Sequence, residues 1–170
     1  MKALITAGGR GTRLRPITYT RNKHMVPLAN HSMIHLAIHK IAKAGIKDII
    51  ISFNEGELDF PDLVRKDLEL DVNLTFVEQK GGALGVAHVI KNARKYLEGD
   101  DFVFYLGDNI ILGDVGEYVK KFQEESLDCL LCVSKVRDPQ RFGVPVIKDG
   151  RIVEVIEKPE NPPTDFAVAG

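Results

Sequence analysis

The sequence predicts an α/β fold with a mostly parallel sheet and helices on both faces. Apolar stretches short enough for strands alternate with longer stretches of helical periodicity, which is the pattern of successive βαβ units. A glycine-rich loop directly follows the first strand, where its backbone lies at the edge at which open α/β sheets bind ligands. Near the end of the chain the alternation stops, and the pattern of a β-hairpin begins.

The first strand is expected at residues 2–6, which form a short apolar run. A helix is expected over residues 33–44, because Ser32 can cap its start, apolar side chains recur at helical spacing and Gly45 can end it. Periodicity and length assign the rest of the alternating region in the same way. Its strands are expected at residues 48–53, 73–78, 102–106 and 129–136, and its helices at residues 62–70, 85–97 and 115–125.

After residue 136 the period changes to that of antiparallel strands. Residues 144–147 and 152–157 flank Asp149-Gly150, a pair that favours a two-residue hairpin turn. Residues 159–163 are rich in proline and are expected to form a loop. The chain contains no repeat and no low-complexity linker, so we expect residues 1–170 to form one domain.

Composition indicates a globular protein. The chain has 170 residues, of which 44% are apolar and 28% charged, and its net charge is −1. No apolar run reaches the roughly 18 residues of a membrane span, and no signal-peptide pattern opens the chain. Cys129 and Cys132 are too far apart along a strand for a disulfide and are expected to be core thiols, which suits a reducing compartment. We therefore expect a cytoplasmic protein that binds no membrane.

Positive charge is concentrated at the front of the chain. Residues 1–47 contain nine Lys or Arg and no acid, whereas residues 48–170 contain 24 acids and 14 bases, which gives them a net charge of −10. A basic front can indicate nucleic-acid binding. Five of the cations fall between Arg10 and Lys23, however, where glycine, threonine and proline separate them and Tyr19 is the single aromatic residue. This compact arrangement suits one polyphosphate, so no nucleic-acid partner is expected.

Three loops are expected to meet at the carboxyl ends of the strands. In the loop after the first strand, glycines let backbone N–H groups approach phosphate oxygens, and Arg13 can make forked hydrogen bonds to them. The glycine spacing matches neither a Walker A loop nor G-x-G-x-x-G. The turn at residues 79–85 and the segment 107–109 complete the set. The structural alternatives are a glycine-rich turn with solvated arginines and an Asp108 that only caps a helix or turn.

Four motifs occur in order along the chain. They are Ala7-Gly8-Gly9-Arg10-Gly11-Thr12-Arg13-Leu14-Arg15-Pro16 with Lys23 and Pro27, then Leu106-Gly107-Asp108-Asn109, Arg141-Phe142-Gly143-Val144 and Glu157-Lys158-Pro159. With these motifs the chain resembles the sugar-1-phosphate nucleotidyltransferases, and Asn109 makes it most similar to their glucose-1-phosphate thymidylyltransferase branch. The resemblance implies the Rossmann-like fold of the nucleotide-diphospho-sugar transferases. It also implies a nucleotide-binding part at residues 1–110 and the start of a sugar-binding part at residues 111–170.

The resemblance further implies an enzyme that transfers a nucleotidyl group from an NTP to a sugar 1-phosphate, with dTTP and glucose 1-phosphate expected. The sugar phosphate attacks the α-phosphorus in line, and Mg²⁺, Arg and Lys neutralise the charge that develops. The implied catalytic residues are Arg13, Lys23 and Asp108, and Asp108 is also the implied Mg²⁺ ligand. Arg13 would hold the β- and γ-phosphates, and Lys23 the phosphates at the reacting end.

The same resemblance implies the residues that contact each substrate. The nucleotide-binding residues would be Ala7, Gly8, Gly9, Gly11, Thr12, Arg13, Gln79 and Gly85, and the sugar-binding residues Gly143, Glu157 and Lys158. The amide of Gln79 can pair with a pyrimidine edge. A surface glutamine and an ordinary exposed Glu-Lys pair are the structural alternatives.

Two further hypotheses stay open. Because related enzymes usually continue well beyond residue 170, the chain could bind a nucleotide or nucleotide sugar without turnover. Because Asn109 alone favours the thymidylyltransferase branch, the chain could also be a uridylyltransferase that uses UTP. Homo-oligomerisation is also left open. His31, His35 and His39 recur at a spacing compatible with zinc, but without a nearby cysteine or carboxylate they favour a partly buried helix face or a subunit contact.

Overall fold

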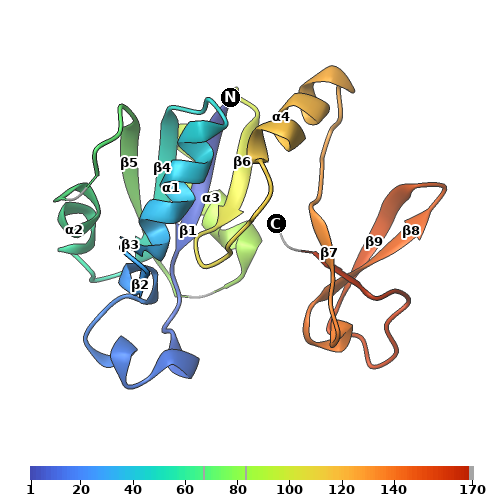
Figure 1. Cartoon of the computed structure of the whole chain (residues 1–170), viewed down its shortest axis with the longest axis horizontal. Coiled ribbons are helices and arrows are strands. Elements are labelled where there is room, and N and C mark those ends of the chain that lie inside the picture. The colour runs from blue at the N-terminus through green and yellow to red at the C-terminus, as the bar shows by residue number, and fades with distance from the viewer. Residues whose placement is uncertain (67, 83, 169–170) are drawn as a thin grey trace. The chain divides into compact units, whose positions relative to one another are not determined.

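The structure, a computed structural model, describes residues 1–66, 68–82 and 84–168 and confirms the α/β class (Figure 1). Contacts within the chain divide it into two compact units, residues 1–125 and residues 126–170. The expected division of binding roles between residues 1–110 and 111–170 stays a prediction.

Four parallel strands form the sheet of the first unit, in the order β5-β4-β1-β6. Their bounds are Lys2–Ala7 for β1, Asp48–Asn54 for β4, Asn73–Gln79 for β5 and Phe102–Leu106 for β6. β1 pairs on both sides, with Leu4 opposite Ile50 and Phe104. Because parallel strands are covered on both faces, the central strand is almost entirely apolar and buried, as its sequence predicts.

Helices cover both faces of this sheet, with α1 and α3 on opposite sides (Figure 1). The helices are α1 at Met33–Lys43, α2 at Phe60–Lys66, α3 at Val86–Leu97 and α4 at Val115–Glu124. Buried side chains of α1, α2 and α4, such as Ile38, Phe60 and Val115, form the larger core cluster with one face of the sheet. Val89 and Ala93 of α3 form a smaller cluster with the other face.

The ends of α1 follow the sequence closely, whereas those of α2 do not. Ser32 caps α1 and accepts a hydrogen bond from the backbone N–H of His35 at 3.4 Å. The helix predicted at residues 62–70 begins instead at Phe60, because Pro61 suits the first turn of a helix, and its described part runs to Lys66. Residue 67 lies outside the described residues, and residues 68–70 are not helical. Leu68 and Leu70 pack against the core from a non-helical segment, so their apolar pattern imitated a longer helix.

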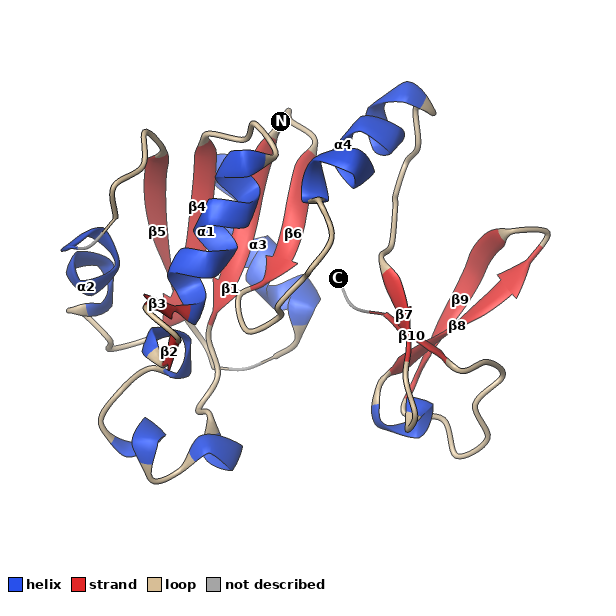
Figure 2. Cartoon of the chain, viewed as in Figure 1, coloured by secondary structure: helices blue, strands red, loops and turns tan. Residues whose placement is uncertain are grey.

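The second unit is built from antiparallel strand pairs (Figure 2). Its strands are β7 at Val133–Lys135, β8 at Gly143–Lys148, β9 at Arg151–Glu157 and β10 at Phe166–Val168. The predicted β8–β9 hairpin is confirmed, since Lys148 pairs with Arg151 and both turn residues have positive φ. The strand predicted at residues 129–136 is shorter, and among the described residues three of its positions pair with β10. Cys129 is exposed, so its predicted place in the core is wrong, and Cys132 is half-buried.

Several short elements have no counterpart in the sequence predictions. They are β2 at Pro27–Leu28, β3 at His31–Ser32, and the 3-10 helices η1 at Thr12–Leu14, η2 at Ile17–Tyr19, η3 at Lys23–Met25 and η4 at Pro139–Arg141. Elements of two or three residues are too short to produce a periodic pattern. Across the residues that the structure describes, no helix has the length and hydropathy that would let it cross a membrane.

The close approach of β1 and β6 requires glycine at position 107. A Cβ atom there would lie 2.3 Å from the carbonyl oxygen of Thr6, to which the Gly107 N–H donates a hydrogen bond at 3.0 Å. Gly107→Ala is therefore expected to lower the free energy of unfolding by about 2 kcal/mol or more, as measured by urea denaturation. Gly113→Ala is the control, because its Cβ would meet the Tyr118 hydroxyl at an ordinary 3.6 Å. Equal stability of the two variants would contradict the tight contact.

Candidate active site

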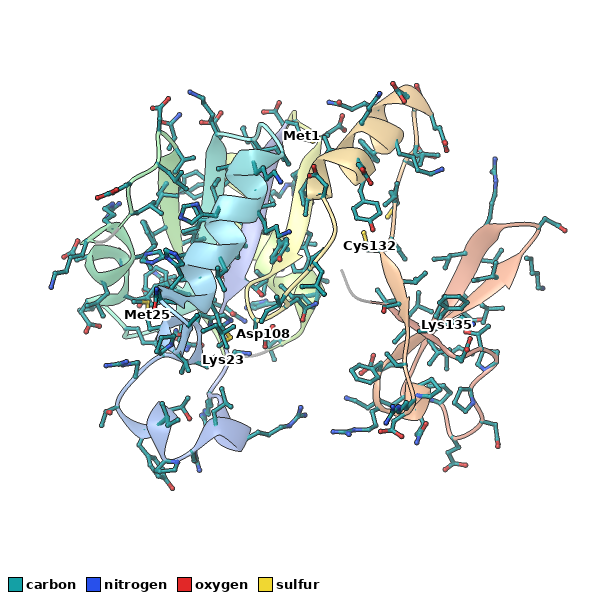
Figure 3. The ribbon with its side chains drawn as sticks, in the orientation of Figure 1. Met1, Lys23, Met25, Asp108, Cys132 and Lys135 are labelled. Carbon is teal, nitrogen blue, oxygen red and sulfur yellow. The ribbon has the colours of Figure 1, made fainter. Side chains whose placement is uncertain are left out.

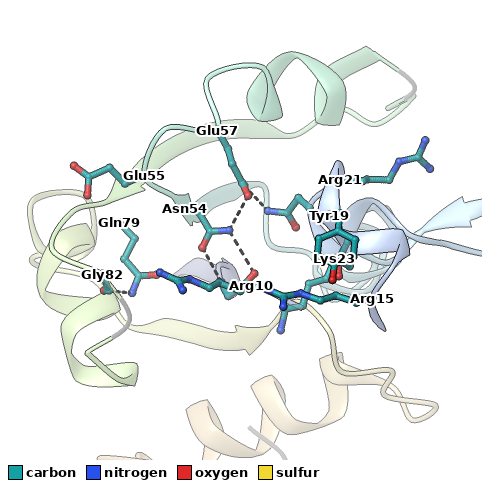
Figure 4. Close-up of a pocket in the computed structure, with 13 residues that line it drawn as sticks. Arg10, Arg15, Tyr19, Arg21, Lys23, Asn54, Glu55, Glu57, Gln79 and Gly82 are labelled. Carbon is teal, nitrogen blue, oxygen red and sulfur yellow. Dashed lines mark hydrogen bonds between the residues drawn. The ribbon is translucent and has the colours of Figure 1, made fainter. Parts of the chain in front are cut away.

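A cavity of about 600 Å³ lies at the carboxyl ends of β1, β4 and β5 (Figure 4). Asn54 and Gln79 reach it as the last residues of β4 and β5. The segment after β1, which winds through η1, η2 and η3, supplies most of the remaining wall. The cavity is thus at the sheet edge where the sequence predicts a ligand site.

The cavity wall carries more positive than negative charge. Its cationic side chains are Arg10, Arg15, Arg21 and Lys23, and its acidic side chains are Glu55 and Glu57. The Arg15 guanidinium also lies over the ring of Tyr19, 5.0 Å from the ring centroid, so a cation–π contact orients it. A concave wall with this excess of cations favours a ligand that bears several negative charges.

Arg13 is exposed on η1 and is not among the residues that line this cavity. Its proposed contact with the β- and γ-phosphates therefore stays a prediction. Arg10, Arg15 and Arg21 are not among the predicted site residues, although they belong to the same basic stretch.

Residues 8–13, called the glycine loop below, approach the cavity wall closely. A Cβ atom on Gly8 would lie 2.7 Å from Gln79 Oε1, and one on Gly11 would lie 2.9 Å from Thr18 Cγ2. Gly11 also has φ of +56°, a left-handed conformation that glycine adopts at little cost. Two of the predicted nucleotide-binding residues flank these glycines, with Ala7 buried at the end of β1 and Thr12 exposed at the start of η1.

Lys23 and Asp108, two of the predicted catalytic residues, are brought into contact. Lys23 Nζ lies 2.5 Å from Asp108 Oδ2, and Figure 3 shows the two side chains near the ends of β1 and β6. The order of the strands reverses between these two, so the pair spans the switch point at which open α/β sheets bind ligands. Burial raises the pKa of Asp108, but the hydrogen bond and charge of Lys23 outweigh it, so the pKa lies below its usual value.

His24, which is not among the predicted site residues, lies buried behind this ion pair. Its Nδ1 and its backbone N–H lie 2.9 and 2.8 Å from Asn22 Oδ1. Burial, followed by the charge of Lys23, lowers the pKa of His24 to about 4, although Asp108 acts in the opposite direction. The imidazole is therefore neutral at neutral pH.

Gln79 is buried, with 9% of its surface exposed, so the alternative of a surface glutamine is wrong. Its Nε2 donates a hydrogen bond to the carbonyl oxygen of Gly82 at 3.0 Å, which sets the orientation of the amide (Figure 4). Gly85 caps the start of α3 with φ of +91°. Whether these two residues read a base stays a prediction.

The three predicted sugar-binding residues lie together in the second unit. Gly143 pairs with Glu157 across the β8–β9 hairpin, and Lys158 Nζ lies 3.0 Å from Glu157 Oε1. Both side chains of the pair are more than 60% exposed, so their attraction contributes little to stability. Their contact with a sugar phosphate stays a prediction.

A chain of hydrogen bonds through Asn54, Glu57 and Asn22 runs along the cavity wall (Figure 4). None of these residues is among those predicted from the sequence. Asn54 could have been identified from its position, since it ends a parallel strand at the edge where ligands bind. Asn22 and Glu57 lie in loops, and nothing in their spacing indicates their contact.

The histidines at positions 31, 35 and 39 do not converge on one point. The rings of His31 and His39 lie 5.9 Å apart, whereas the buried His35 places Nε2 2.8 Å from the carbonyl oxygen of Val64. Within the described part of the chain, no three His, Cys, Asp or Glu side chains form a group that could hold a metal ion.

Comparison with known proteins identifies a family and relatives that are named as nucleotidyltransferases. The model of the family described as nucleotidyl transferase matches residues 2–170. A glucose-1-phosphate thymidylyltransferase of Streptomyces antibioticus is 40% identical over 100% of this chain and 48% of its own length. A UTP–glucose-1-phosphate uridylyltransferase of Haloferax volcanii is 33% identical over 100% of this chain and 70% of its own length.

A solved structure from Bacillus anthracis, described as a glucose-1-phosphate thymidylyltransferase, is similar to the whole chain. It has a TM-score of 0.92 and 35% identity, and the match covers 69% of that protein. The chain spans about half the length of three curated relatives that it matches over its whole length.

The low pKa of His24 predicts a specific loss of stability in acid. Between pH 6.5 and about 4 the unfolded chain protonates this histidine and the folded chain does not, so the free energy of unfolding falls as the pH is lowered. From pH 7 to pH 5 the loss from this group is expected to be about 2 kcal/mol. Urea denaturation of the wild type and of His24→Asn, which keeps a donor for Asn22 but does not titrate, measures it. The same pH dependence in both proteins would contradict the assignment.

Proposed function

Because the chain belongs to the nucleotidyl transferase family, we propose that it transfers a nucleotidyl group from an NTP to a sugar 1-phosphate. The observation that carries the proposal is the cationic cavity at the carboxyl edge of the parallel sheet, with the Lys23–Asp108 pair beside it. A nucleoside triphosphate is a ligand of matching charge, and this edge is where nucleotides bind in such sheets.

The reaction needs no nucleophile from the protein. A phosphate oxygen of the sugar 1-phosphate forms the new bond to the α-phosphorus, and the bond from that phosphorus to the bridging oxygen breaks as pyrophosphate leaves. The task of the site is to hold two anions that repel each other and to neutralise the charge of the transition state. In the proposal, the glycine loop and Arg13 bind the β- and γ-phosphates, and Lys23 binds the phosphates at the reacting end.

Asp108 is the proposed Mg²⁺ ligand. Its carboxylate provides the hard oxygen atoms that Mg²⁺ prefers, and it is partly exposed at the edge of the sheet. Since no three potential ligands form a group among the described residues, substrate phosphates and water would complete the shell, as is common for Mg²⁺. When bound, the ion would neutralise phosphate charge.

The proposed substrates are dTTP and glucose 1-phosphate. The 40% identity to the Streptomyces antibioticus enzyme and the asparagine at position 109 support dTTP. Gln79 and Gly85 are the proposed base contacts, and Gly143, Glu157 and Lys158 the proposed sugar contacts. Use of UTP is the alternative that the Haloferax volcanii relative supports. Nucleotide binding without turnover is a second candidate, because the residues that line the cavity all belong to the first unit, whereas the proposed sugar contacts belong to the second.

Arg13→Ala and Asp108→Asn are each expected to lower kcat/KM for dTTP and glucose 1-phosphate by about a hundredfold or more, because each removes a charge that the transition state requires. Release of pyrophosphate in the presence of Mg²⁺ measures the rate. Arg94→Ala is the control, since it removes an exposed arginine on α3 that pairs with Glu98. Full activity in both site variants would contradict the proposed roles of Arg13 and Asp108. Tight dTTP binding by the wild type without release of pyrophosphate would favour nucleotide binding without turnover.

Substrate choice can be measured in one matrix of reactions. Four NTPs, including dTTP and UTP, are each combined with the 1-phosphates of glucose, mannose, galactose and N-acetylglucosamine. We expect the highest kcat/KM for dTTP with glucose 1-phosphate. A higher value for UTP would instead identify a uridylyltransferase.

A further inference from the structure

Glu57, in the loop between β4 and α2, joins two asparagines on the wall of the cavity (Figure 4). Its Oε1 accepts a hydrogen bond from Asn54 Nδ2 at 2.8 Å, and its Oε2 accepts one from Asn22 Nδ2 at 2.5 Å. All three residues are half-buried. Each oxygen of the carboxylate is therefore occupied by a side chain from a different segment.

The carboxylate determines which way both amides face. A carboxylate only accepts hydrogen bonds, so Asn54 and Asn22 must both turn their NH₂ groups toward Glu57. Their oxygen atoms consequently face the other way, Asn54 Oδ1 toward the N–H of Gly9 at 2.7 Å and Asn22 Oδ1 toward His24. One carboxylate thus fixes the orientation of two amide groups, whose oxygen and nitrogen are similar in size but accept and donate hydrogen bonds, respectively.

Through Asn54, this orientation reaches the backbone of the glycine loop. Asn54 accepts from the Gly9 N–H and donates to the Gly9 carbonyl oxygen, at 2.7 and 3.4 Å. The peptide between Gly9 and Arg10 is trans, so its carbonyl and its N–H point in opposite directions. Holding the carbonyl toward Asn54 therefore turns the Arg10 N–H away from Asn54. Two successive peptide groups of the loop are set by one side chain.

Through Asn22, the carboxylate of Glu57 also orients the segment that holds Lys23 beside Asp108. Asn22 Nδ2 also donates to the carbonyl oxygen of Ala7 at 3.0 Å, at the end of β1. Its Oδ1 caps η3, the short helix in which Lys23 lies beside Asp108. Glu57 accordingly links the glycine loop to the Lys23 segment.

Negative charge by itself would oppose the proposed ligand. A carboxylate on the wall of a polyphosphate site repels the phosphates, and Glu55 and Glu57 both line the cavity. No hydrogen bond or ion pair joins the Glu55 side chain to any other described residue, whereas Glu57 orients two amides. The two glutamates therefore share their charge and differ in their hydrogen bonds.

We propose that Glu57 is a positioning residue of the nucleotide site. Its acceptor-only carboxylate orients Asn54 and Asn22, and these hold the glycine loop and the Lys23 segment in the conformation that binds the triphosphate. The inference rests on the proposed function, because the ligand is taken to be an NTP. The conformation of the loop itself can be measured without any ligand.

Glu57→Gln tests the proposal without a change in side-chain volume. The new amide presents a donor to one asparagine, which then loses its acceptor, so amide hydrogen exchange at Gly9 is expected to speed up about tenfold or more. The Kd for dTTP is expected to weaken by about tenfold. Glu55→Gln removes the same charge from the same cavity and is the matched control. It should leave exchange at Gly9 unchanged and bind dTTP as tightly as the wild type or more tightly.

A double variant can restore the contacts among residues 54, 57 and 22 and with the Gly9 N–H, although an aspartate at position 54 cannot donate to the Gly9 carbonyl oxygen. In Asn54→Asp with Glu57→Gln, the new glutamine donates to the new aspartate and accepts from Asn22, while the other aspartate oxygen accepts from the Gly9 N–H. The total charge equals that of the wild type. We expect exchange at Gly9, whose N–H keeps its acceptor, to return to within a few-fold of the wild-type rate, and the Kd for dTTP to be tighter than in Glu57→Gln. Asn54→Asp alone, which sets two carboxylates against each other, should be impaired in both.

Wild-type exchange at Gly9 together with wild-type affinity for dTTP in Glu57→Gln would overturn the proposal, and so would a double variant in which exchange at Gly9 is no slower than in Glu57→Gln. Rescue by the double variant supports a role in hydrogen-bond orientation, because a role in packing alone predicts no defect in Glu57→Gln. A wild-type chain that binds none of the four NTPs would overturn the proposed function instead. In that case the exchange at Gly9 in the same four variants still decides whether Glu57 orders the loop.

Discussion

Parallel pairing of β1 with both β4 and β6 is the constraint on which the site depends. Because the strands are parallel, their carboxyl ends meet at one edge, so residues far apart in the sequence become neighbours. Asn54 reaches the glycine loop across 45 residues, and Lys23 reaches Asp108 across 85. A shift of register between β1 and β6 would break the close contact of Gly107 with Thr6 and would move Asp108 with it.

At the carboxyl edge of the sheet, Asp108 forms an ion pair with Lys23. Lys23 contacts the carboxylate directly, and its charge helps to keep the buried His24 neutral. A protonated His24 would be a second cation beside Asp108, and it would also be a buried charge whose desolvation is costly. With a neutral imidazole, the hydrogen bond from Nδ1 to Asn22 orders the segment without adding charge. The remaining positive charge of the cavity is left to the arginines, which can bind an anion.

The sequence predicted the regular elements well and the loops poorly, for identifiable reasons. The four strands of the sheet and α1 agree within a residue or so, because buried parallel strands and a capped amphipathic helix leave strong local patterns. The helix α2 was misplaced because Leu68 and Leu70 pack in the core without being helical. Lys23 and Asp108 could be identified from motifs, whereas Glu57 acts through contacts between loops, which have no period. Which arginines of the basic stretch face the cavity depends on the irregular path of η1 and η2.

Under the proposed function, nucleotide binding and sugar binding fall to different units of the chain. Every residue that lines the cavity belongs to the first unit, and Gly143, Glu157 and Lys158 belong to the second. The network that orders the glycine loop is likewise complete within residues 7–57. If the chain acts as proposed, binding of the triphosphate therefore depends on residues of the first unit, whereas turnover also needs the acceptor phosphate to be held in line with the α-phosphorus. In that proposal, nucleotide affinity and the rate of transfer can vary separately, because the two steps depend on residues of different units.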